Sequence, residues 1–307
     1  MVDGRKQPSD AGDGGTTTLP TADESLYGDV LGEGTAVGRF VVEAHVADGG
    51  YARVYRAREA TTGHPVAIKV LHRVLVARGN VLRRFEREVR TVRRLRQRNI
   101  VAMLDAGHLA DGRPYLVMEW LDGPTLVEEL RRVGPLPPAR ALTIAEEVAA
   151  ALEAAHAAGI VHRDLKASNV ILAGSPPVAK LLDFGVAKPI DVGTRLTTTG
   201  INVGTPASMA PEQIAGGPIT PATDVYALAV LVFRMLVGRY PFAAANAVEM
   251  QDRHLRATPA VPGAFDPALR PFDAVLLRAL EKDPARRHPS VSALVADLRA
   301  VAAGELS

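Results

Sequence analysis

Hydrophobic positions in the first third of the chain come in short runs that predict β-strands. Such runs cover residues 38–43, 54–58 and 66–69. Residues 61–64, which include Gly63, form a turn between the second run and the third. The pattern therefore predicts consecutive strands joined by short turns.

A helical periodicity follows over residues 81–98. Its apolar side chains form one stripe, made of Phe85, Val89, Val92 and Leu95. Glu88 lies within this stripe, and because a carboxylate on an inward face needs a cation, Lys69 is the candidate partner. The same segment carries arginines from Arg83 to Arg98. They form a solvated outer face, with a nucleic-acid-binding patch as the alternative.

Three later segments complete the pattern. Residues 115–121 predict a buried strand that runs into a connector, and 122–124 break it. Residues 139–158 are rich in alanine without a helix breaker, so they predict a long helix. Residues 225–237 are nearly all apolar and end at Gly238, which predicts a helix buried on every side. The rest of the chain is also predicted to be helical.

Composition limits the class of protein. The chain has 307 residues, of which 47% are hydrophobic, which suffices for the core of one large domain or two small ones. It contains no cysteine, so disulfides and thiolate chemistry are excluded. A formal net charge of only +2 is a weak argument for a polyanionic partner, so we expect no nucleic-acid partner.

The first 35 residues differ in composition from the rest. They are rich in Gly, Asp, Thr, Ser and Pro, which predicts a flexible N-terminal tail over 1–35. Residues 1–25 lack the apolar segment of a signal peptide. The most apolar later run, 225–237, is too short to span a bilayer and contains Arg234. We therefore expect a cytoplasmic protein without a transmembrane segment.

Two glycine-rich stretches compete as a phosphate-binding loop, 32–38 and 47–54. The first fits a bare glycine pattern better, but the second lies between two predicted strands and one hairpin before the strand that carries Lys69. We therefore assign the loop to the second stretch. The residues expected to approach the phosphates or the base are Ala47, Asp48, Gly49, Gly50 and Val54.

Residues with phosphate and metal chemistry follow the long helix directly. Asp164, Lys166 and Asn169 lie within eight residues, and Asp183 stands just before Phe184 and Gly185. Carboxylate and carboxamide oxygens suit a hard divalent cation, and Lys69 suits a phosphate. These residue types together indicate a nucleoside triphosphate with a divalent metal as the ligand.

In the order of these motifs, residues 38–303 resemble a eukaryotic-type (Hanks-type) serine/threonine protein kinase, closest to the bacterial ones. The resemblance implies an α+β fold of two lobes within a kinase domain over 36–303. The small β-rich N-lobe with its helix C covers about 36–119. A hinge covers about 119–124, and the larger helical C-lobe covers about 125–303.

The resemblance implies catalytic roles for four residues. Asp164 would accept or orient the proton of the substrate hydroxyl, and Lys166 would neutralise charge on the transferring phosphoryl group. Glu88 would pair with Lys69 and fix it on the α- and β-phosphates of ATP. Asn169 and Asp183 would hold Mg²⁺, for which Mn²⁺ can substitute.

The resemblance also implies an adenine site between the lobes. Val54, Ala67 and Ile171 would sandwich the ring, while the backbone of Glu119 and Leu121 would hydrogen-bond its edge. Met118 would be the gatekeeper. The residue types of this segment fit an ordinary strand-to-loop transition equally well. In the glycine-rich loop, Ala47 and Ala52 replace the outer two glycines of the family pattern, which predicts weaker nucleotide affinity.

Regulation is expected in the segment between Asp183 and Glu212. Bacterial relatives carry phosphothreonines where Thr197 and Thr199 stand, although Thr198 is an equally good position. Arg163 would supply a cation to such a phosphate, and a homodimer would bring two such segments together for autophosphorylation. The residues expected to shape the peptide site and its support are Thr205, Glu212, Asp224 and Arg287, with Glu212 and Arg287 forming an ion pair.

The leading interpretation is an enzyme that transfers phosphate from ATP to serine or threonine hydroxyls of proteins. One alternative is a pseudokinase, a nucleotide-binding scaffold without turnover, which the altered glycine loop would favour. A nucleic-acid binder and a small-molecule kinase of the same fold are further alternatives. The segment 210–212 and the long activation segment argue against the small-molecule kinase, because they form a platform for a peptide.

Overall fold

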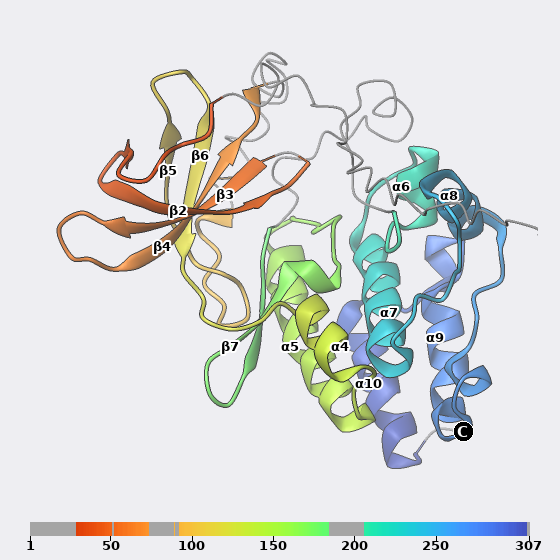
Figure 1. Ribbon diagram of the computed structural model, residues 1–307. Coiled ribbons are helices and arrows are strands. Elements are labelled where there is room, and N and C mark those ends of the chain that lie inside the picture. The colour runs from red at the N-terminus through yellow and green to blue at the C-terminus, as the bar shows by residue number, and fades with distance from the viewer. Residues whose placement is uncertain (1–28, 51, 74–88, 90–91, 184–205, 306–307) are drawn as a thin grey trace, which may run out of the picture.

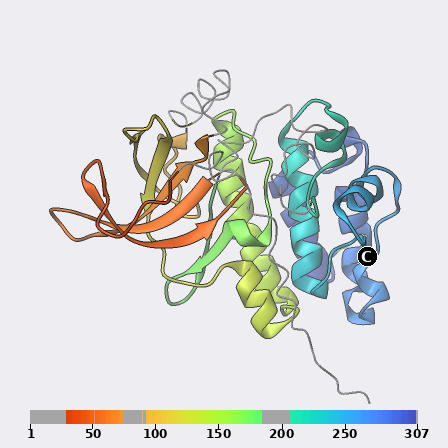
Figure 2. The ribbon, with the colours of Figure 1, turned by 45° about the horizontal axis from the view of Figure 1, so that its top comes forward.

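The computed structural model describes residues 29–50, 52–73, 89, 92–183 and 206–305. They form a sheet at one end of the molecule and a group of helices at the other, joined by the chain that leaves β6 (Figure 1). A second view shows that α5 and the β7 hairpin lie on the side of the helical lobe that faces the sheet (Figure 2). The α+β, two-lobed fold expected from the sequence is confirmed.

The N-lobe sheet is antiparallel throughout, with strand order β1-β2-β3-β4-β6-β5. Its strands are β1 (Ala36–Val37), β2 (Phe40–Asp48), β3 (Ala52–Glu59), β4 (Pro65–Leu71), β5 (Met103–His108) and β6 (Pro114–Glu119). The predicted strands are thus present, although β2 extends five residues beyond the predicted end at 43. Its register shifts between Val42 and Ala44 and again between His45 and Ala47, so no simple alternation marks its second half.

The two faces of this sheet have different roles. Tyr55 and Ile68 pair across β3 and β4, are fully buried, and belong to the core on one face. Val54 pairs with Lys69 in the neighbouring register position. Because successive side chains of a strand point to opposite faces, Val54 and Lys69 lie on the other face.

The N-terminal boundary of the folded part lies earlier than the sequence suggested. The backbone N–H of Gly34 donates to the carbonyl of Val42 at 2.9 Å, and that of Leu31 donates to the hydroxyl of Tyr55 at 3.2 Å. The nearly buried Arg113 donates to the carbonyl of Asp29 at 2.9 Å. Residues 29–35 are therefore attached to the sheet, and a tail reaching to residue 35 was wrong in its last part. Polar composition alone does not show such backbone and side-chain pairing.

The helical lobe is built around two long helices. The elements described there are α4 (Leu126–Val133), α5 (Pro138–Ala157), α6 (Pro211–Ala215), α7 (Pro221–Val237), α8 (Ala247–Arg256), α9 (Asp273–Ala279) and α10 (Val291–Ala303), with the hairpin β7 (Val170–Ala173) and β8 (Val178–Leu181). Short 3-10 turns are η1 (Ala167–Asn169), η3 (Pro262–Ala264), η4 (Pro267–Phe272) and η5 (Pro284–Arg286).

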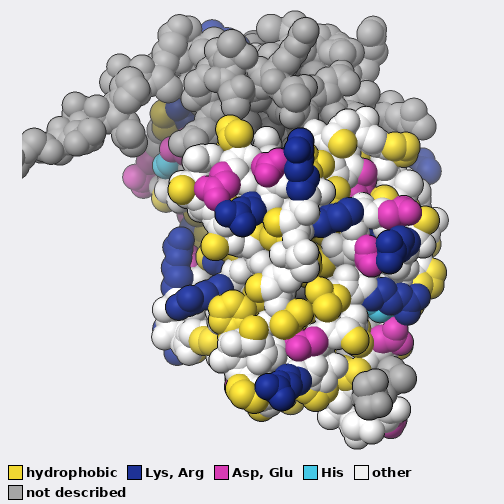
Figure 3. All heavy atoms as spheres, turned by 90° about the vertical axis from the view of Figure 1, so that its right-hand side faces the viewer, with side chains coloured by type: hydrophobic (Ala, Val, Ile, Leu, Met, Phe, Trp, Pro, Cys, Tyr) yellow, Lys and Arg dark blue, Asp and Glu magenta, His cyan; other side chains and the backbone are white. Residues whose placement is uncertain are grey.

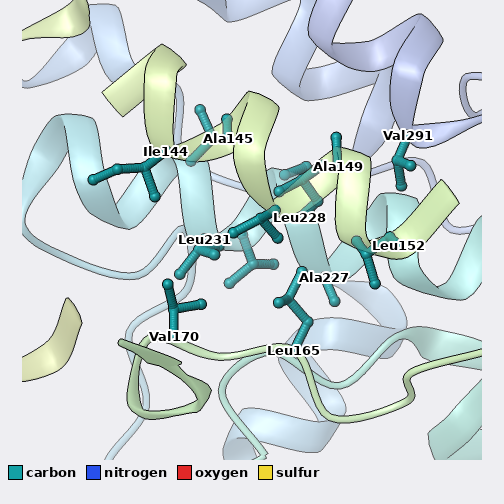
Figure 4. Packing of buried hydrophobic residues seen from close by; sticks show 14 of the residues in the cluster. Ile144, Ala145, Ala149, Leu152, Leu165, Val170, Ala227, Leu228, Leu231 and Val291 are labelled. Carbon is teal, nitrogen blue, oxygen red and sulfur yellow. The ribbon is translucent and has the colours of Figure 1, made fainter. Parts of the chain in front are cut away.

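Helix α7 is buried around its whole circumference, as its continuous apolar sequence predicted. Leu228 and Leu231 pack against α5 at Ile144 and Ala145 (Figure 4). Leu165, which lies in the loop after α5, joins the same cluster and is fully buried. The loop that carries the candidate catalytic residues is therefore anchored directly in the core.

The helix predicted over 81–98 lies mostly outside the described residues, as does Glu88. Val89 and Val92 are both 7% exposed, in agreement with the predicted apolar stripe. The helical assignment ends at Val92, so the predicted end at residue 98 was too late. Turn and irregular residues follow from 93 to 99, and Ile100 then forms a bridge with Leu181 of β8.

No helix within the described ranges is long and apolar enough to cross a membrane.

Candidate active site

The loop between α5 and β7 is held by one buried carboxylate. Asp224 is fully buried near the start of α7. Its oxygens accept the backbone N–H groups of His162 at 2.8 Å and of Arg163 at 3.0 Å, and contact Nε2 of His156 at 2.8 Å. Arg163 has a φ of 66°, a left-handed conformation that is unfavourable for an arginine and is maintained by the surrounding bonds.

His162 joins the two segments that carry the predicted acidic residues. It is fully buried, and its Nδ1 accepts the backbone N–H of Asp164 at 3.2 Å. Its Nε2 lies 2.9 Å from the carbonyl of Leu182, to which it must donate, since a carbonyl only accepts. His162 therefore joins the Asp164 loop to the segment just before Asp183, which is a structural role.

Two polar residues of the same loop contact Asp164. The side-chain amide of Asn169 donates to the Asp164 carbonyl at 2.8 Å and to its Oδ2 at 3.2 Å. The Nζ atom of Lys166 lies 3.2 Å from the same Oδ2. Both donors contact a carboxylate that remains 19% exposed. The Asn169 amide nitrogen is engaged, which directs its amide oxygen elsewhere.

Asp183 brings the helical lobe into contact with the sheet. Its Oδ2 lies 2.7 Å from Nζ of Lys69 on β4. The backbone N–H of Leu182 donates to the carbonyl of Asn169 at 2.8 Å, so the two predicted metal ligands lie on paired segments. Asp183 itself has a φ of 50°, an uncommon conformation that fits a functional position. The structure thus places Lys69, Asp164, Asn169 and Asp183 in one region between the lobes.

The donor set of Asn169 and Asp183 fits a magnesium ion. Both offer hard oxygen atoms, and Mg²⁺ is commonly held by one or two carboxylates together with substrate phosphates and water. Within the ranges that the structure describes, no group of three or more His, Cys, Asp or Glu side chains could hold a metal by itself. Asn169 and Asp183 would supply two of the ligands of such a cation.

The glycine-rich loop lies where strand context predicted it. Residues 49–51 connect β2 with β3, and the backbone N–H of Gly49 donates to the carbonyl of Ala52 at 2.8 Å. An ion pair between Asp48 and Arg53, 2.9 Å long, closes the base of the hairpin. The competing stretch 32–38 instead runs along β1 at the other end of β2. Ala52 is only 2% exposed, so its methyl group packs into the protein.

The connector after β6 is attached to both lobes. The backbone N–H of Glu119 donates to the carbonyl of Ala102 at 3.0 Å. The carbonyl of Glu119 is therefore the backbone group of this residue that could bond the edge of a base. The Glu119 carboxylate accepts from Ala102 N–H at 2.8 Å and contacts Nζ of Lys180 on β8 at 2.6 Å. Sequence reasoning missed Lys180, because a single lysine in a short strand has no distinguishing pattern.

The floor of the predicted adenine site is formed where this connector meets β7. Thr125 bridges to Ile171, and the backbone N–H of Leu172 donates to the carbonyl of Pro124 at 2.9 Å. Gly123 has a φ of 150°, and a Cβ atom there would lie 2.1 Å from the carbonyl oxygen of Leu172. Only glycine permits this close approach. The sequence marked Gly123 only as a strand breaker.

The predicted pair of Glu212 and Arg287 is present beneath the site. Arg287 Nη2 lies 2.7 Å from Glu212 Oε2, and both residues are less than 9% exposed. Thr223 Oγ1 donates to Glu212 Oε1 at 2.8 Å, and Arg287 also donates to the carbonyls of Ala222 and Glu281, each at 2.8 Å. The pair is buried and well supplied with hydrogen bonds, which offsets its desolvation.

Several predicted residues lie outside the described part of the chain: Glu88, Thr197, Thr198, Thr199 and Thr205. The contact of Lys69 with Glu88 and the assignments in the activation segment therefore remain predictions. Half of the arginines between Arg83 and Arg98 also lie outside the described residues. On the face of the helical lobe seen in Figure 3, basic and acidic side chains are interspersed, so that face has no broad positive surface for a polyanion.

Comparisons with known proteins agree with this geometry. A family model described as "Protein kinase domain" matches residues 40–296. Serine/threonine-protein kinase pkn3 of Myxococcus xanthus is 36% identical over 272 residues, covering 86% of this chain and 50% of pkn3. Serine/threonine-protein kinase PknL of Mycobacterium tuberculosis is 38% identical over 266 residues, covering 86% of this chain and 66% of PknL.

Solved structures show the same similarity. The crystal structure of the Mycobacterium tuberculosis PknI kinase domain aligns with a TM-score of 0.72 at 28% sequence identity. The alignment covers 89% of this chain and 100% of that one. In contrast, the chain spans between half and two thirds of the length of pkn3 and PknL.

Proposed function

The chain belongs to the protein kinase family, and we propose from this that it transfers the γ-phosphoryl group of ATP to serine or threonine hydroxyls of proteins. The observation that carries the proposal is the gathering of Lys69, Asp164, Asn169 and Asp183 between the lobes, with Lys69 and Asp183 only 2.7 Å apart. Cation, carboxylates and carboxamide are the groups that phosphoryl transfer requires at one place.

Each of these side chains has a separate role in the proposed reaction. Asp164, ionised and oriented by Asn169 and Lys166, accepts a hydrogen bond from the acceptor hydroxyl and takes its proton as the oxygen attacks phosphorus. Lys166 Nζ, 3.2 Å from Asp164, is close enough to stabilise negative charge on the transferring phosphoryl group. Lys69 binds the non-transferred phosphates. The new O–P bond forms as the bond from the γ-phosphorus to the bridging oxygen breaks, and ADP leaves.

Asn169 and Asp183 would hold Mg²⁺ or Mn²⁺ through their side-chain oxygens. A divalent cation bound there would supply positive charge next to the phosphates. The Lys69–Asp183 contact supports this assignment, because the cation proposed to bind phosphate lies beside the carboxylate proposed to bind the metal.

The adenine would lie between the sheet and the β7 hairpin. Val54 and Ala67 supply the apolar surface of the sheet, and Ile171 supplies that of β7, while the carbonyl of Glu119 and the backbone of Leu121 would bond the edge of the base. Met118, 9% exposed at the end of β6, would limit the depth of this site.

We assign protein serine and threonine as acceptors because Lys166 follows Asp164 by two residues, the form that accompanies such substrates in the family. The names of pkn3 and PknL as serine/threonine-protein kinases support this. Activation would follow from autophosphorylation at Thr197 and Thr199 with Arg163 as a cation for the phosphate, in a homodimer. We further propose that the protein acts in the cytoplasm.

Incorporation of labelled phosphate from Mg·ATP tests the proposal, with wild type beside Asp164→Asn. Asp252→Asn is a matched control, because Asp252 is an exposed residue of α8 in a surface ion pair. Labelled threonine in the wild type and in Asp252→Asn, but not in Asp164→Asn, is the expected result. Nucleotide binding by a wild-type protein that labels neither itself nor myelin basic protein would indicate a scaffold instead.

A further inference from the structure

A buried histidine contacts the glycine-rich loop. β4 ends at Leu71, and the next residue, His72, places its Nε2 2.8 Å from the carbonyl oxygen of Gly49. His72 is only 2% exposed, whereas Gly49 is exposed, so the hydrogen bond is partly buried. The contact links the strand that carries Lys69 to the loop that lies 23 residues earlier in the sequence.

The chemistry of this contact defines the hydrogen position. A backbone carbonyl only accepts, so Nε2 of His72 carries a hydrogen and donates it whatever the charge of the ring. The peptide unit between Gly49 and Gly50 is planar, and its C=O and N–H point in opposite directions. A bond that fixes the Gly49 carbonyl therefore also fixes the direction of the Gly50 N–H.

The other contacts that the structure describes in this loop lie at its base. The Asp48–Arg53 ion pair and the Gly49-to-Ala52 backbone bond close the hairpin below it. Two consecutive glycines impose little restriction of their own on the plane between them. The backbone N–H groups of such loops are the donors that surround phosphates, so the orientation of this plane matters for nucleotide binding.

We propose that His72 is a positioning residue that orients the glycine-rich loop for the phosphates of ATP. It does so through the Gly49 carbonyl, before the nucleotide binds, and so reduces the ordering that binding requires. The identity of the nucleotide rests on the function proposed above. Loss of the donor is expected to raise the Kd and KM for Mg·ATP by about 2- to 10-fold, the effect of one ordinary hydrogen bond, with kcat nearly unchanged.

Four variants separate this role from general packing. His72→Leu and His72→Asn both remove the donor at the Nε2 position, one by an apolar and one by a shorter polar side chain. His72→Gln returns an N–H at the same number of bonds from the backbone. His64→Leu is the matched control, because His64 is an exposed histidine in the turn before β4.

Three readouts are needed: Mg·ATP affinity by titration calorimetry, the separate values of KM and kcat, and hydrogen exchange at the amides of Gly49 and Gly50. We expect faster exchange and weaker affinity in His72→Leu and His72→Asn, recovery in His72→Gln, and wild-type values in His64→Leu. Thermal melting identifies any variant that is unfolded. If either His72→Leu or His72→Asn is unfolded, the other one is used to test the proposal.

Unchanged affinity and exchange in a folded donor-free variant would overturn the proposal. So would failure of His72→Gln to recover, or tighter ATP binding on loss of the donor, which would mean that the contact holds the loop away from nucleotide. Failure of the proposed function has a different signature. A wild type without phosphate transfer would still show the exchange difference at Gly49 and Gly50 if His72 has the role assigned here.

Discussion

Replacing Asp224 with alanine tests whether one buried carboxylate sets the shape of the catalytic loop. Asp224 accepts two backbone N–H groups, from His162 at 2.8 Å and from Arg163 at 3.0 Å, and contacts Nε2 of His156 at 2.8 Å. Asp164, the proposed base, is the next residue after Arg163. The variant should therefore affect both folding and phosphate transfer.

The magnitude follows from the groups left without an acceptor. Each buried N–H that loses its partner costs about 1–3 kcal/mol, so the two together cost about 2–6 kcal/mol. Water entering the vacated volume recovers part of this. We expect the free energy of unfolding to fall by about 3 kcal/mol, within the range of a large core substitution. Because the φ of Arg163 is 66°, relaxation of the backbone should also displace Asp164 and reduce phosphate transfer at least about tenfold.

Urea unfolding and initial rates of phosphate incorporation measure the two effects. Asp252→Ala is the control, since the Asp252 side chain is 59% exposed in an i,i+4 pair with Arg256 and should change stability by less than about 1 kcal/mol. If Asp224→Ala matched this control in both stability and rate, Asp224 would not be holding the loop.

Three further predictions concern the support of the site. Arg287→Met should lower the free energy of unfolding by about 3–5 kcal/mol, because it leaves the buried Glu212 carboxylate without its cation; adding Glu212→Gln should recover part of the loss in urea unfolding. Gly123→Ala should destabilise by about 2–3 kcal/mol and weaken ATP binding in calorimetry, because its methyl group would overlap the Leu172 carbonyl, and wild-type behaviour would contradict the close approach. Burial lowers the pKa of His254 from 6.5 to about 4, so the unfolded chain binds more protons between these values and stability should fall on the order of 3 kcal/mol as pH drops from 7 to 4. Urea unfolding at several pH values should show that the stability of His254→Gln depends less on pH than the stability of the wild type. An unchanged slope of stability against pH would mean that His254 is not the source of the dependence.

The order of elements and the residues of the catalytic loop were predictable from the sequence because they are local. The eight residues 162–169 combine unusual residue types at fixed spacing, and α7 is nearly all apolar from Val225 to Val237. Strand context also predicted that the second glycine-rich stretch joins two strands, as β2 and β3 show, although a bare glycine count favoured the other stretch.

Contacts between distant segments could not be predicted in the same way. Ile100 pairs with Leu181 after the arginine-rich segment, and Arg113 attaches Asp29 to the sheet, but neither contact leaves a local pattern. The contacts of Lys180 with Glu119 and of His72 with Gly49 are single side chains that bridge separate strands. Such contacts depend on tertiary packing, which hydrophobic periodicity does not specify.

The rate of phosphate transfer from Mg·ATP to a protein acceptor, measured at saturating nucleotide, tests the central claim most directly. Wild type should transfer phosphate to serine or threonine, and Asp164→Asn should bind nucleotide with similar affinity yet transfer it about 10² to 10⁴ times more slowly, the loss typical of a general base. Transfer by Asp164→Asn at the wild-type rate would contradict the role given to Asp164. No transfer by a wild type that is saturated with nucleotide would contradict the enzyme itself.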